Sequence, residues 1–113
     1  MWKDNNDEIE ELFLKLKTIQ TFPAICPLCR KKSAHIYMHI YDGKTRRGGL
    51  WIWCSMCHSF SHSSIFVPDY WENYSLVEIE KLSAIPIYLE EIKEKIDDHV
   101  QYIINTCFSS HFK

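Results

Sequence analysis

Apolar side chains near the start of the chain recur at helical spacing. In residues 7–20 they lie three or four positions apart, follow Asn and Asp as N-cap candidates, and have acids in the first turn. The apolar positions are Ile9, Leu12, Phe13, Leu16 and Ile19. This spacing predicts an amphipathic helix over 7–20 that packs its apolar stripe against the rest of the domain.

The pattern changes to period two in the following segment. Across residues 34–41, apolar side chains alternate with His and Tyr, which predicts a strand with two different faces. Residues 42–49 begin with Asp-Gly and end with Gly-Gly, both suited to the positive φ angles of a turn, and 50–53 predicts the returning strand. A third strand is expected within 60–67, where Ser and His interrupt the apolar positions.

Helices are expected after the sheet. The Pro within residues 67–69 ends the sheet, because proline removes a donor from the strand ladder. Residues 75–78 match a capping box and predict a short helix that ends near Ser83. Pro86 suits the first turn of a second helix with one apolar stripe, so that 75–108 forms a helical C-terminal part. Its many acids and lysines are interpreted as a solvated face.

The composition is that of a single globular domain. The chain has 113 residues, of which 46% are hydrophobic and 25% charged, and this excludes disorder and a multidomain enzyme. Its apolar runs are far too short for a membrane helix, and its acidic start lacks the features of a secretory signal. We therefore expect residues 1–113 to form one soluble, cytoplasmic domain without a membrane partner.

The formal net charge of -2 conceals an uneven distribution. Residues 1–20 carry three Lys and five acids, residues 21–60 carry six Lys or Arg and one Asp, and residues 61–113 carry four Lys and nine acids. A basic centre therefore lies between two acidic flanks. Four thiolates and one Zn²⁺ would add -2 to that centre and leave it only mildly basic.

Two Cys-x2-Cys pairs flank the predicted hairpin. Cys26 and Cys29 precede it, Cys54 and Cys57 follow it, and 24 residues separate the pairs. In a reducing compartment such pairs favour metal binding over disulfides. Because Zn²⁺ accepts four thiolates in a closed tetrahedron, these cysteines are the predicted ligands of a structural zinc ion. The fifth cysteine, Cys107, lies on the apolar stripe and is interpreted as an inert core thiol.

The two pairs and the intervening hairpin resemble a zinc ribbon over residues 22–67. The resemblance implies an α+β fold in which a small antiparallel sheet with two zinc knuckles packs against an N-terminal helix and C-terminal helices. Many ribbons have Gly after the second Cys of a knuckle, whereas this chain has Arg30 and His58. His58 is also a candidate replacement ligand, or a hydrogen-bond partner of a ligand.

A second resemblance concerns residues 47–62 and the Val-Pro-Asp-Tyr-Trp stretch at 67–71. These segments are similar to small uncharacterised bacterial proteins, some of which act as immunity or antitoxin partners of secreted toxins. The similarity implies binding of a protein partner and assigns no residue to that role.

Other metal and redox chemistries fit parts of the same motif. A rubredoxin-like iron site uses the same four ligands. Residues 54–58 also match the Cys-x-x-Cys-His motif of haem attachment, which would leave the first pair unexplained. The first pair alone matches a redox dithiol, although it neither follows a clear strand nor opens a long helix.

Three functions are open at this stage. We expect a non-enzymatic protein that binds a protein partner, a toxin being one candidate, with exposed aromatic and charged side chains as anchors. The candidate partner-binding residues are Arg46, Arg47, Trp51 and Trp53. The alternative is nucleic-acid binding, in which Arg46 and Arg47 contact phosphates and Trp51 and Trp53 stack on bases, against an acidic pI of about 6.3. The hairpin register decides whether these indoles are core or surface.

The third function is a metal-dependent hydrolase. It would use a histidine cluster as ligands and general base, and the chain has few carboxylates near that cluster. The candidate histidines are His35, His39, His58 and His62.

Overall fold

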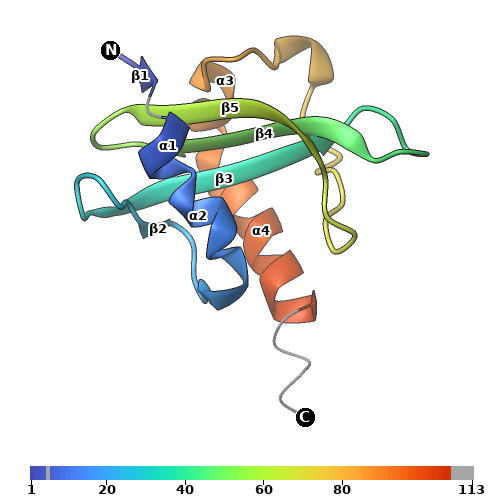
Figure 1. Ribbon diagram of the computed structural model, residues 1–113, viewed down its shortest axis with the longest axis horizontal. Coiled ribbons are helices and arrows are strands. Elements are labelled where there is room, and N and C mark those ends of the chain that lie inside the picture. The colour runs from blue at the N-terminus through green and yellow to red at the C-terminus, as the bar shows by residue number, and fades with distance from the viewer. Residues whose placement is uncertain (5, 108–113) are drawn as a thin grey trace.

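The described residues, 1–4 and 6–107 of a computed structural model, form a five-stranded sheet with helices on both faces (Figure 1). The strands are β1 (Lys3–Asp4), β2 (Ala24–Ile25), β3 (Lys32–Ile40), β4 (Arg47–Cys54) and β5 (Ser59–Phe66). Their order in the sheet is β1-β5-β4-β3-β2. Strands β3, β4 and β5 form an antiparallel meander, while β1 runs parallel to β5 and β2 antiparallel to β3. The predicted hairpin and third strand are confirmed.

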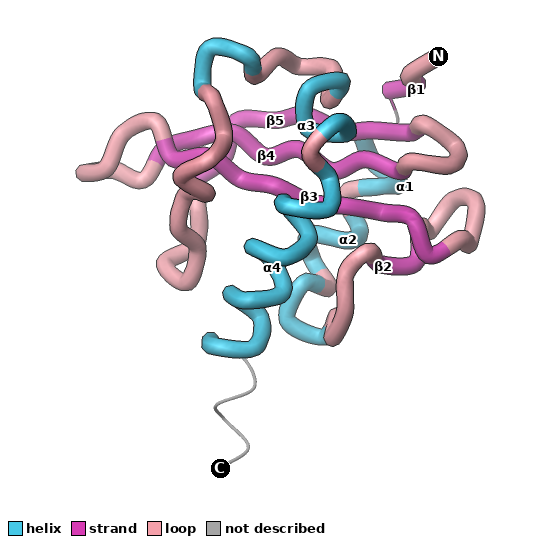
Figure 2. Tube along the Cα trace, turned by 180° about the vertical axis from the view of Figure 1, so that it is seen from behind, coloured by secondary structure: helices cyan, strands magenta, loops and turns pink. Residues whose placement is uncertain are grey.

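The helical segments form one layer on each side of the sheet. They are α1 (Asn6–Ile9), α2 (Glu11–Leu14), α3 (Ile87–Glu91) and α4 (Lys93–Cys107). Figure 1 shows α1 and α2 in front of the sheet, and Figure 2 shows α3 and α4 covering the opposite face. None of the helices in the described part of the chain is long and apolar enough to cross a membrane.

The register of β3 and β4 decides which side chains form the core. Tyr37 pairs with Trp51 and His35 with Trp53, so these four side chains share the face covered by α3 and α4. Trp51 Nε1–H donates to the Ser83 carbonyl at 2.7 Å, and both indoles are buried. The period-two pattern therefore marks a sheet that is buried on both faces, because its apolar residues lie under α1 and α2.

The turn between β3 and β4 differs from the prediction. Gly48 and Gly49 lie inside β4 and have no positive φ, and the left-handed residue is Arg46, with φ 64°. A Cβ at Gly48 would overlap the His39 carbonyl oxygen of the neighbouring strand. Close approach of two backbones, rather than chain reversal, explains this glycine.

The helix predicted over 7–20 is divided. Helices α1 and α2 and a 3₁₀ turn over Leu16–Thr18 follow one another with changes of direction. The Thr18 N–H and the Thr18 hydroxyl both donate to the Lys15 carbonyl, at 2.9 and 2.7 Å, so the segment ends in a 3₁₀ turn. The apolar stripe is nevertheless buried, since Ile9, Leu12 and Leu16 all lie in the core.

The prediction of a short helix from the capping box at 75–78 is wrong. Residues 75–76 form a turn and Ile79–Lys81 form a single 3₁₀ turn. The Glu78 carboxylate pairs with Lys81 Nζ at 3.0 Å, and its backbone N–H donates to the Tyr88 hydroxyl at 2.9 Å. The carboxylate is thus engaged by a neighbouring lysine, and the backbone N–H by a residue ten positions further on.

The second C-terminal helix is present in two parts, because Ile92 adopts φ -112° between α3 and α4. Pro86 immediately precedes α3, and the predicted stripe is buried at Leu89, Ile96 and Val100. Residue 108, the predicted end of this region, lies outside the described residues. The interpretation of all its acids as solvated is wrong at Asp97, which is buried.

Candidate metal centre

The two Cys-x2-Cys pairs adopt the same backbone turn. In the first, the Arg30 N–H donates to the Cys26 carbonyl at 2.9 Å; in the second, the His58 N–H donates to the Cys54 carbonyl at 3.0 Å. Arg30 and His58 have φ 64° and 61°, the left-handed conformation that glycine adopts most easily. The chain therefore keeps the geometry of a glycine-containing knuckle with side chains at both positions.

Backbone donors also point at the sulfur atoms in equivalent ways. The Leu28 N–H lies 3.4 Å from Cys26 Sγ, and the Met56 N–H lies 3.4 Å from Cys54 Sγ. Such donors stabilise negative charge on sulfur. Each turn is thus built to hold a thiolate at its first cysteine.

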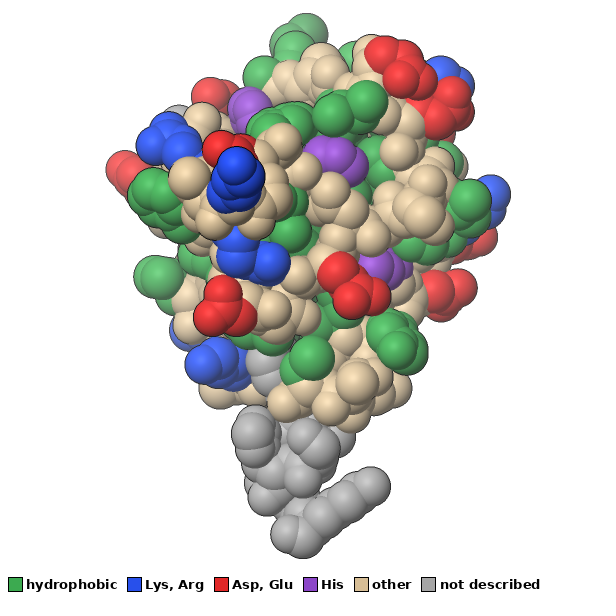
Figure 3. Space-filling model, turned by 90° about the vertical axis from the view of Figure 1, so that its right-hand side faces the viewer, with side chains coloured by type: hydrophobic (Ala, Val, Ile, Leu, Met, Phe, Trp, Pro, Cys, Tyr) green, Lys and Arg blue, Asp and Glu red, His purple; other side chains and the backbone are tan. Residues whose placement is uncertain are grey.

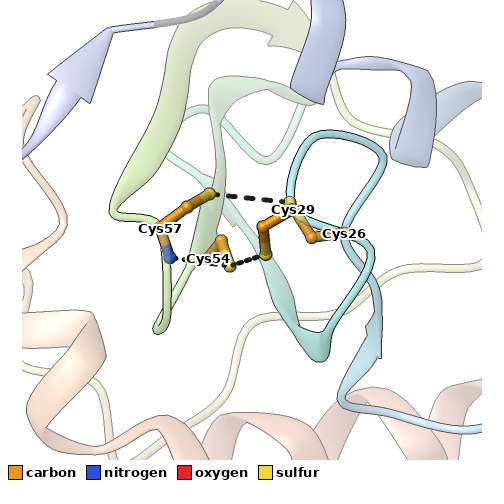
Figure 4. Close-up of side chains that lie close together, drawn as sticks. All are labelled: Cys26, Cys29, Cys54 and Cys57. Atoms are coloured by element: carbon orange, nitrogen blue, oxygen red, sulfur yellow. Dashed lines mark hydrogen bonds between the residues drawn. The ribbon is translucent and has the colours of Figure 1, made fainter.

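The strands bring the two turns face to face. Because Ala34 pairs with Cys54, the start of β3 and the end of β4 place the two pairs at the same end of the sheet. Figure 4 shows the four sulfur atoms, from Cys26, Cys29, Cys54 and Cys57, directed toward one another.

The sulfur positions fit one tetrahedral ion. Cys26 Sγ lies 3.8 Å from Cys57 Sγ, Cys29 Sγ lies 3.6 Å from Cys54 Sγ, and all four atoms lie within 4.8 Å of one another. A regular tetrahedron with metal–sulfur bonds of about 2.3 Å has edges of about 3.8 Å. The distances are far from the roughly 2 Å of a disulfide, and all four thiols are free. The predicted ligand set can bind a metal ion.

Burial opposes ionisation of this site in the absence of metal. It raises the pKa of the Cys26 thiol to about 12 and also raises the pKa of Cys54. Burial acts in the same direction on Cys57, but hydrogen bonds from Ser59 and from neighbouring cysteines outweigh it and lower the pKa to about 7. The fold therefore favours thiolates at the first cysteines only when a cation compensates the charge.

Metal affinity should consequently fall steeply as the pH decreases. Because at least Cys26 and Cys54 are protonated near neutral pH and must lose protons to bind, we expect the dissociation constant to rise about a hundredfold per unit decrease in pH. Competition with a chromogenic chelator at several pH values measures this slope. A dissociation constant that does not change with pH would contradict ligation by these thiols.

Two serine hydroxyls lie against the sulfur atoms and were not found from the sequence. Ser33 Oγ lies 3.0 Å from Cys54 Sγ, and Ser59 Oγ lies 3.4 Å from Cys57 Sγ. A hydroxyl that donates to a bound thiolate orients it and reduces its charge. Nothing in the local sequence marks Ser33, because strand pairing alone brings it to the second turn.

The metal-ligating group found among the described residues consists of the four cysteines alone, without His58. The His58 ring instead stacks on Trp2, with ring centroids 4.7 Å apart. Strand β1 places Trp2 there, because the Lys3 N–H donates to the His58 carbonyl at 2.8 Å. The structure thus gives His58 a packing role at the surface of the second turn.

The residues predicted to contact a partner or nucleic acid have other roles. The Arg46 guanidinium donates to the carbonyls of Val67, Pro68 and Trp71 at 3.0, 2.6 and 2.8 Å and so fixes the end of β5. Arg47 lies over the Phe66 ring at 5.2 Å.

A role of Trp51 and Trp53 at the surface is wrong, because both indoles are buried in the core. The face in Figure 3, at the β3–β4 turn, mixes cationic, acidic and apolar side chains and has no continuous basic surface.

The candidate histidines are also dispersed. His39 Nδ1 lies 2.8 Å from the Tyr37 hydroxyl, and the His62 ring stacks on Trp51 at 4.4 Å. Among residues 1–4 and 6–107, no group of histidines and carboxylates has the spacing of a metal site. The histidine cluster predicted for a hydrolase is therefore not assembled.

His35 belongs to a buried network that the sequence did not reveal. Its Nδ1 lies 2.8 Å from Asp97 Oδ1 on α4, and its Nε2 lies 2.8 Å from Ser55 Oγ, inside the second cysteine turn. Ser55 Oγ in turn donates to Glu90 Oε1 on α3 at 2.8 Å, and Lys93 Nζ pairs with Glu90 at 3.0 Å. The network joins the metal centre to both C-terminal helices.

The Ser-His-Asp order in this network matches that of a hydrolytic triad, but its hydrogen bonds do not. Burial acts to raise the pKa of Glu90, but hydrogen bonds from Ser55, Lys93 and Trp53 outweigh it and lower the pKa, so the carboxylate is an acceptor. The Ser55 hydroxyl donates to Glu90 Oε1, so its single proton is directed at a carboxylate and not at the His35 ring. A nucleophilic serine needs an imidazole that accepts its proton. The geometry is that of a structural ion-pair network.

No protein-family model, no curated protein and no solved structure matches the chain. The evidence for the α+β fold and for the four-cysteine cluster is therefore the geometry of the structure alone.

Proposed function

We propose that the protein is a zinc-ribbon domain with a structural metal centre, and that it functions by binding a protein partner without catalysing a reaction. The closed ligand set supports the structural role. Four thiolates complete a zinc tetrahedron and leave no position for substrate, and Cys26 and Cys54 are fully buried. Zinc is favoured over iron because no further redox group lies among the described residues near these sulfurs.

The observation that carries partner binding is a concentration of exposed aliphatic side chains in one segment. Residues 76–87, here termed the 76–87 surface, expose four large aliphatic side chains by 43% or more: Leu76, Ile79, Ile85 and Ile87. Exposed apolar groups within a polar rim are typical of protein interfaces. Here the rim carries Glu78 and Glu80 together with Lys81, which pairs with Glu78, so its net charge is -1.

The segment is also held in place, which favours binding with little loss of conformational entropy. Val77 is buried in the core, Trp51 Nε1–H donates to the Ser83 carbonyl, and Lys81 Nζ lies 5.6 Å from the centre of the Tyr88 ring. We infer a partner that presents an apolar surface with basic residues around it. Residues 47–62 and 67–71 resemble small uncharacterised bacterial proteins, some of which neutralise toxins, so a toxin is the first class of partner to test.

Substitution of Leu76 and Ile79 by Ser should abolish partner binding without unfolding the protein, because both side chains are exposed. The measurement is quantitative pull-down from the native cell, followed by light scattering of the purified complex. The matched control is Leu14→Ser, which removes an 83% exposed side chain on the other side of the sheet. If the double variant retains a stoichiometric partner at wild-type affinity, the 76–87 surface is not the interface.

A further inference from the structure

A pocket of about 470 Å³ lies beside the first cysteine turn, away from the 76–87 surface. Helix α2, the loop that follows it, β2 and the first cysteine turn line it. Part of the wall is apolar, with Leu12, Ile19, Pro23 and Ile25 contributing. This combination of an apolar wall and polar groups is typical of a small-molecule site.

The polar groups of the pocket are mainly cationic. Lys15, Arg30 and Lys32 line it together with a single acid, Glu11. Lys15 pairs with Glu11 at 3.4 Å, so that acid is already compensated. Arg30 and Lys32 form no ion pair with any residue in 1–4 or 6–107. The pocket therefore has an uncompensated positive charge.

The backbone at Arg30 gives an independent indication. Three non-glycine residues of the described chain have positive φ: Arg30, Arg46 and His58. This conformation costs about 1 kcal/mol or more for a residue with a Cβ, so retention of a side chain calls for a compensating contact.

Two of the three have such a contact. The Arg46 side chain donates three hydrogen bonds to backbone carbonyls, and the His58 ring stacks on Trp2. The Arg30 guanidinium has no hydrogen bond, ion pair or ring contact within the described part of the chain. It lines the pocket instead. The side chain is exposed, so a ligand can reach its guanidinium.

We propose that this pocket binds an organic carboxylate, with Arg30 as its principal anchor and Lys32 as a second cation. A guanidinium donates two parallel hydrogen bonds to a carboxylate, and the wall from Leu12 to Ile25 receives the apolar body of the ligand. The carboxylate is that of a small free acid or of a peptide C-terminus, which share this chemistry. The inference does not depend on the 76–87 surface.

The test uses hexanoate as probe and hexanamide as its uncharged match. We expect hexanoate, titrated into ¹⁵N-labelled holoprotein, to shift the backbone amides of Leu12, Ile25, Arg30 and Lys32, and hexanamide to leave them unchanged. A second pair, acetyl-Leu-Leu with a free C-terminus and its C-terminal amide, assigns the source. Tighter binding of the dipeptide acid indicates a peptide ligand, and tighter binding of hexanoate indicates a small acid.

Arg30→Gly separates ligand binding from folding, because glycine suits the left-handed backbone and the substitution removes only the guanidinium. We expect its affinity for hexanoate to fall about tenfold or more, with unfolding stability equal to or above that of the wild type. His58→Gly makes the same backbone change in the other turn and should leave the hexanoate affinity unchanged.

Two results would overturn the proposal. One is the absence of carboxylate-dependent shifts at the pocket. The other is an Arg30→Gly variant that binds hexanoate like the wild type but binds zinc more weakly, since Arg30 would then serve only to offset the -2 charge of the metal thiolates.

Discussion

Replacement of Cys26 and Cys54 by Ser is expected to lower the free energy of unfolding by about 10 kcal/mol, comparable with the whole stability of a domain this size. The reason is topological as well as chemical. The metal would link the turn before β3 to the turn between β4 and β5, and the two replaced sulfurs are its most buried ligands. Without them, the ends of the three longest strands lose their connection.

Thermal unfolding followed by circular dichroism, with and without a chelator, measures this effect. The matched control is Cys107→Ser: this half-buried thiol lies 3.7 Å from the Tyr70 carbonyl, far from the other four in the sequence. We expect that variant to unfold close to the wild type and to respond equally to the chelator. A Cys26→Ser, Cys54→Ser protein that melts within a few degrees of the wild type would contradict a metal that stabilises the fold.

The second large effect on the stability of the fold is expected when one partner of the His35–Asp97 pair is removed. We expect Asp97→Ala to destabilise the fold by about 1–3 kcal/mol, because it leaves the buried His35 Nδ1 without its hydrogen-bond partner. His35→Ala should cost a similar amount, since the buried Asp97 carboxylate loses its hydrogen-bond partner.

A double-mutant cycle measured by urea unfolding tests the coupling. The loss in the double variant His35→Ala, Asp97→Ala should be well below the sum of the single losses, because no unpaired charge remains. The control is His99→Ala, in which a half-buried ring loses its hydrogen bond to the Glu72 carbonyl at 2.8 Å and its contacts with the Trp71 and Tyr74 rings. Additive losses at His35 and Asp97 would show that the two side chains do not act as a pair.

The metal ligands could be predicted because their signal is local in sequence. A Cys-x2-Cys turn can form around one ion wherever it occurs, and a hairpin between two such turns brings them together. The period-two pattern of β3 predicted the strand equally well. Neither prediction required knowledge of what covers the sheet.

The remaining features depend on contacts between distant elements. Trp51 and Trp53 have the composition of a stacking surface, and only the placement of α3 and α4 over their face makes them core. Glu78 matches a capping box, but its backbone N–H donates to the Tyr88 hydroxyl, ten residues further on. Asp97 lies among acids that face solvent, yet β3 brings His35 within 2.8 Å of it. No local sequence pattern indicates these contacts.

At the position after the second cysteine of each pair, the sequence is unusual but the backbone conformation is not. Arg30 and His58 occupy sites where ribbons often have glycine, and this departure left the turn geometry open at the sequence level. The structure shows that the backbone keeps the left-handed conformation regardless, with φ 64° and 61°. The departure thus concerns the side chains and what they contact, and at Arg30 it points to a ligand.

Native mass spectrometry of the protein as isolated, without added metal or chelator, tests the central claim most directly. We expect a single species with the mass of the chain and one zinc ion, less the protons displaced from the four thiols. The same measurement on the Cys26→Ser, Cys54→Ser variant should give the metal-free mass. A wild-type protein that shows only the metal-free mass, or iron or haem in place of zinc, would contradict a structural zinc centre at these four cysteines.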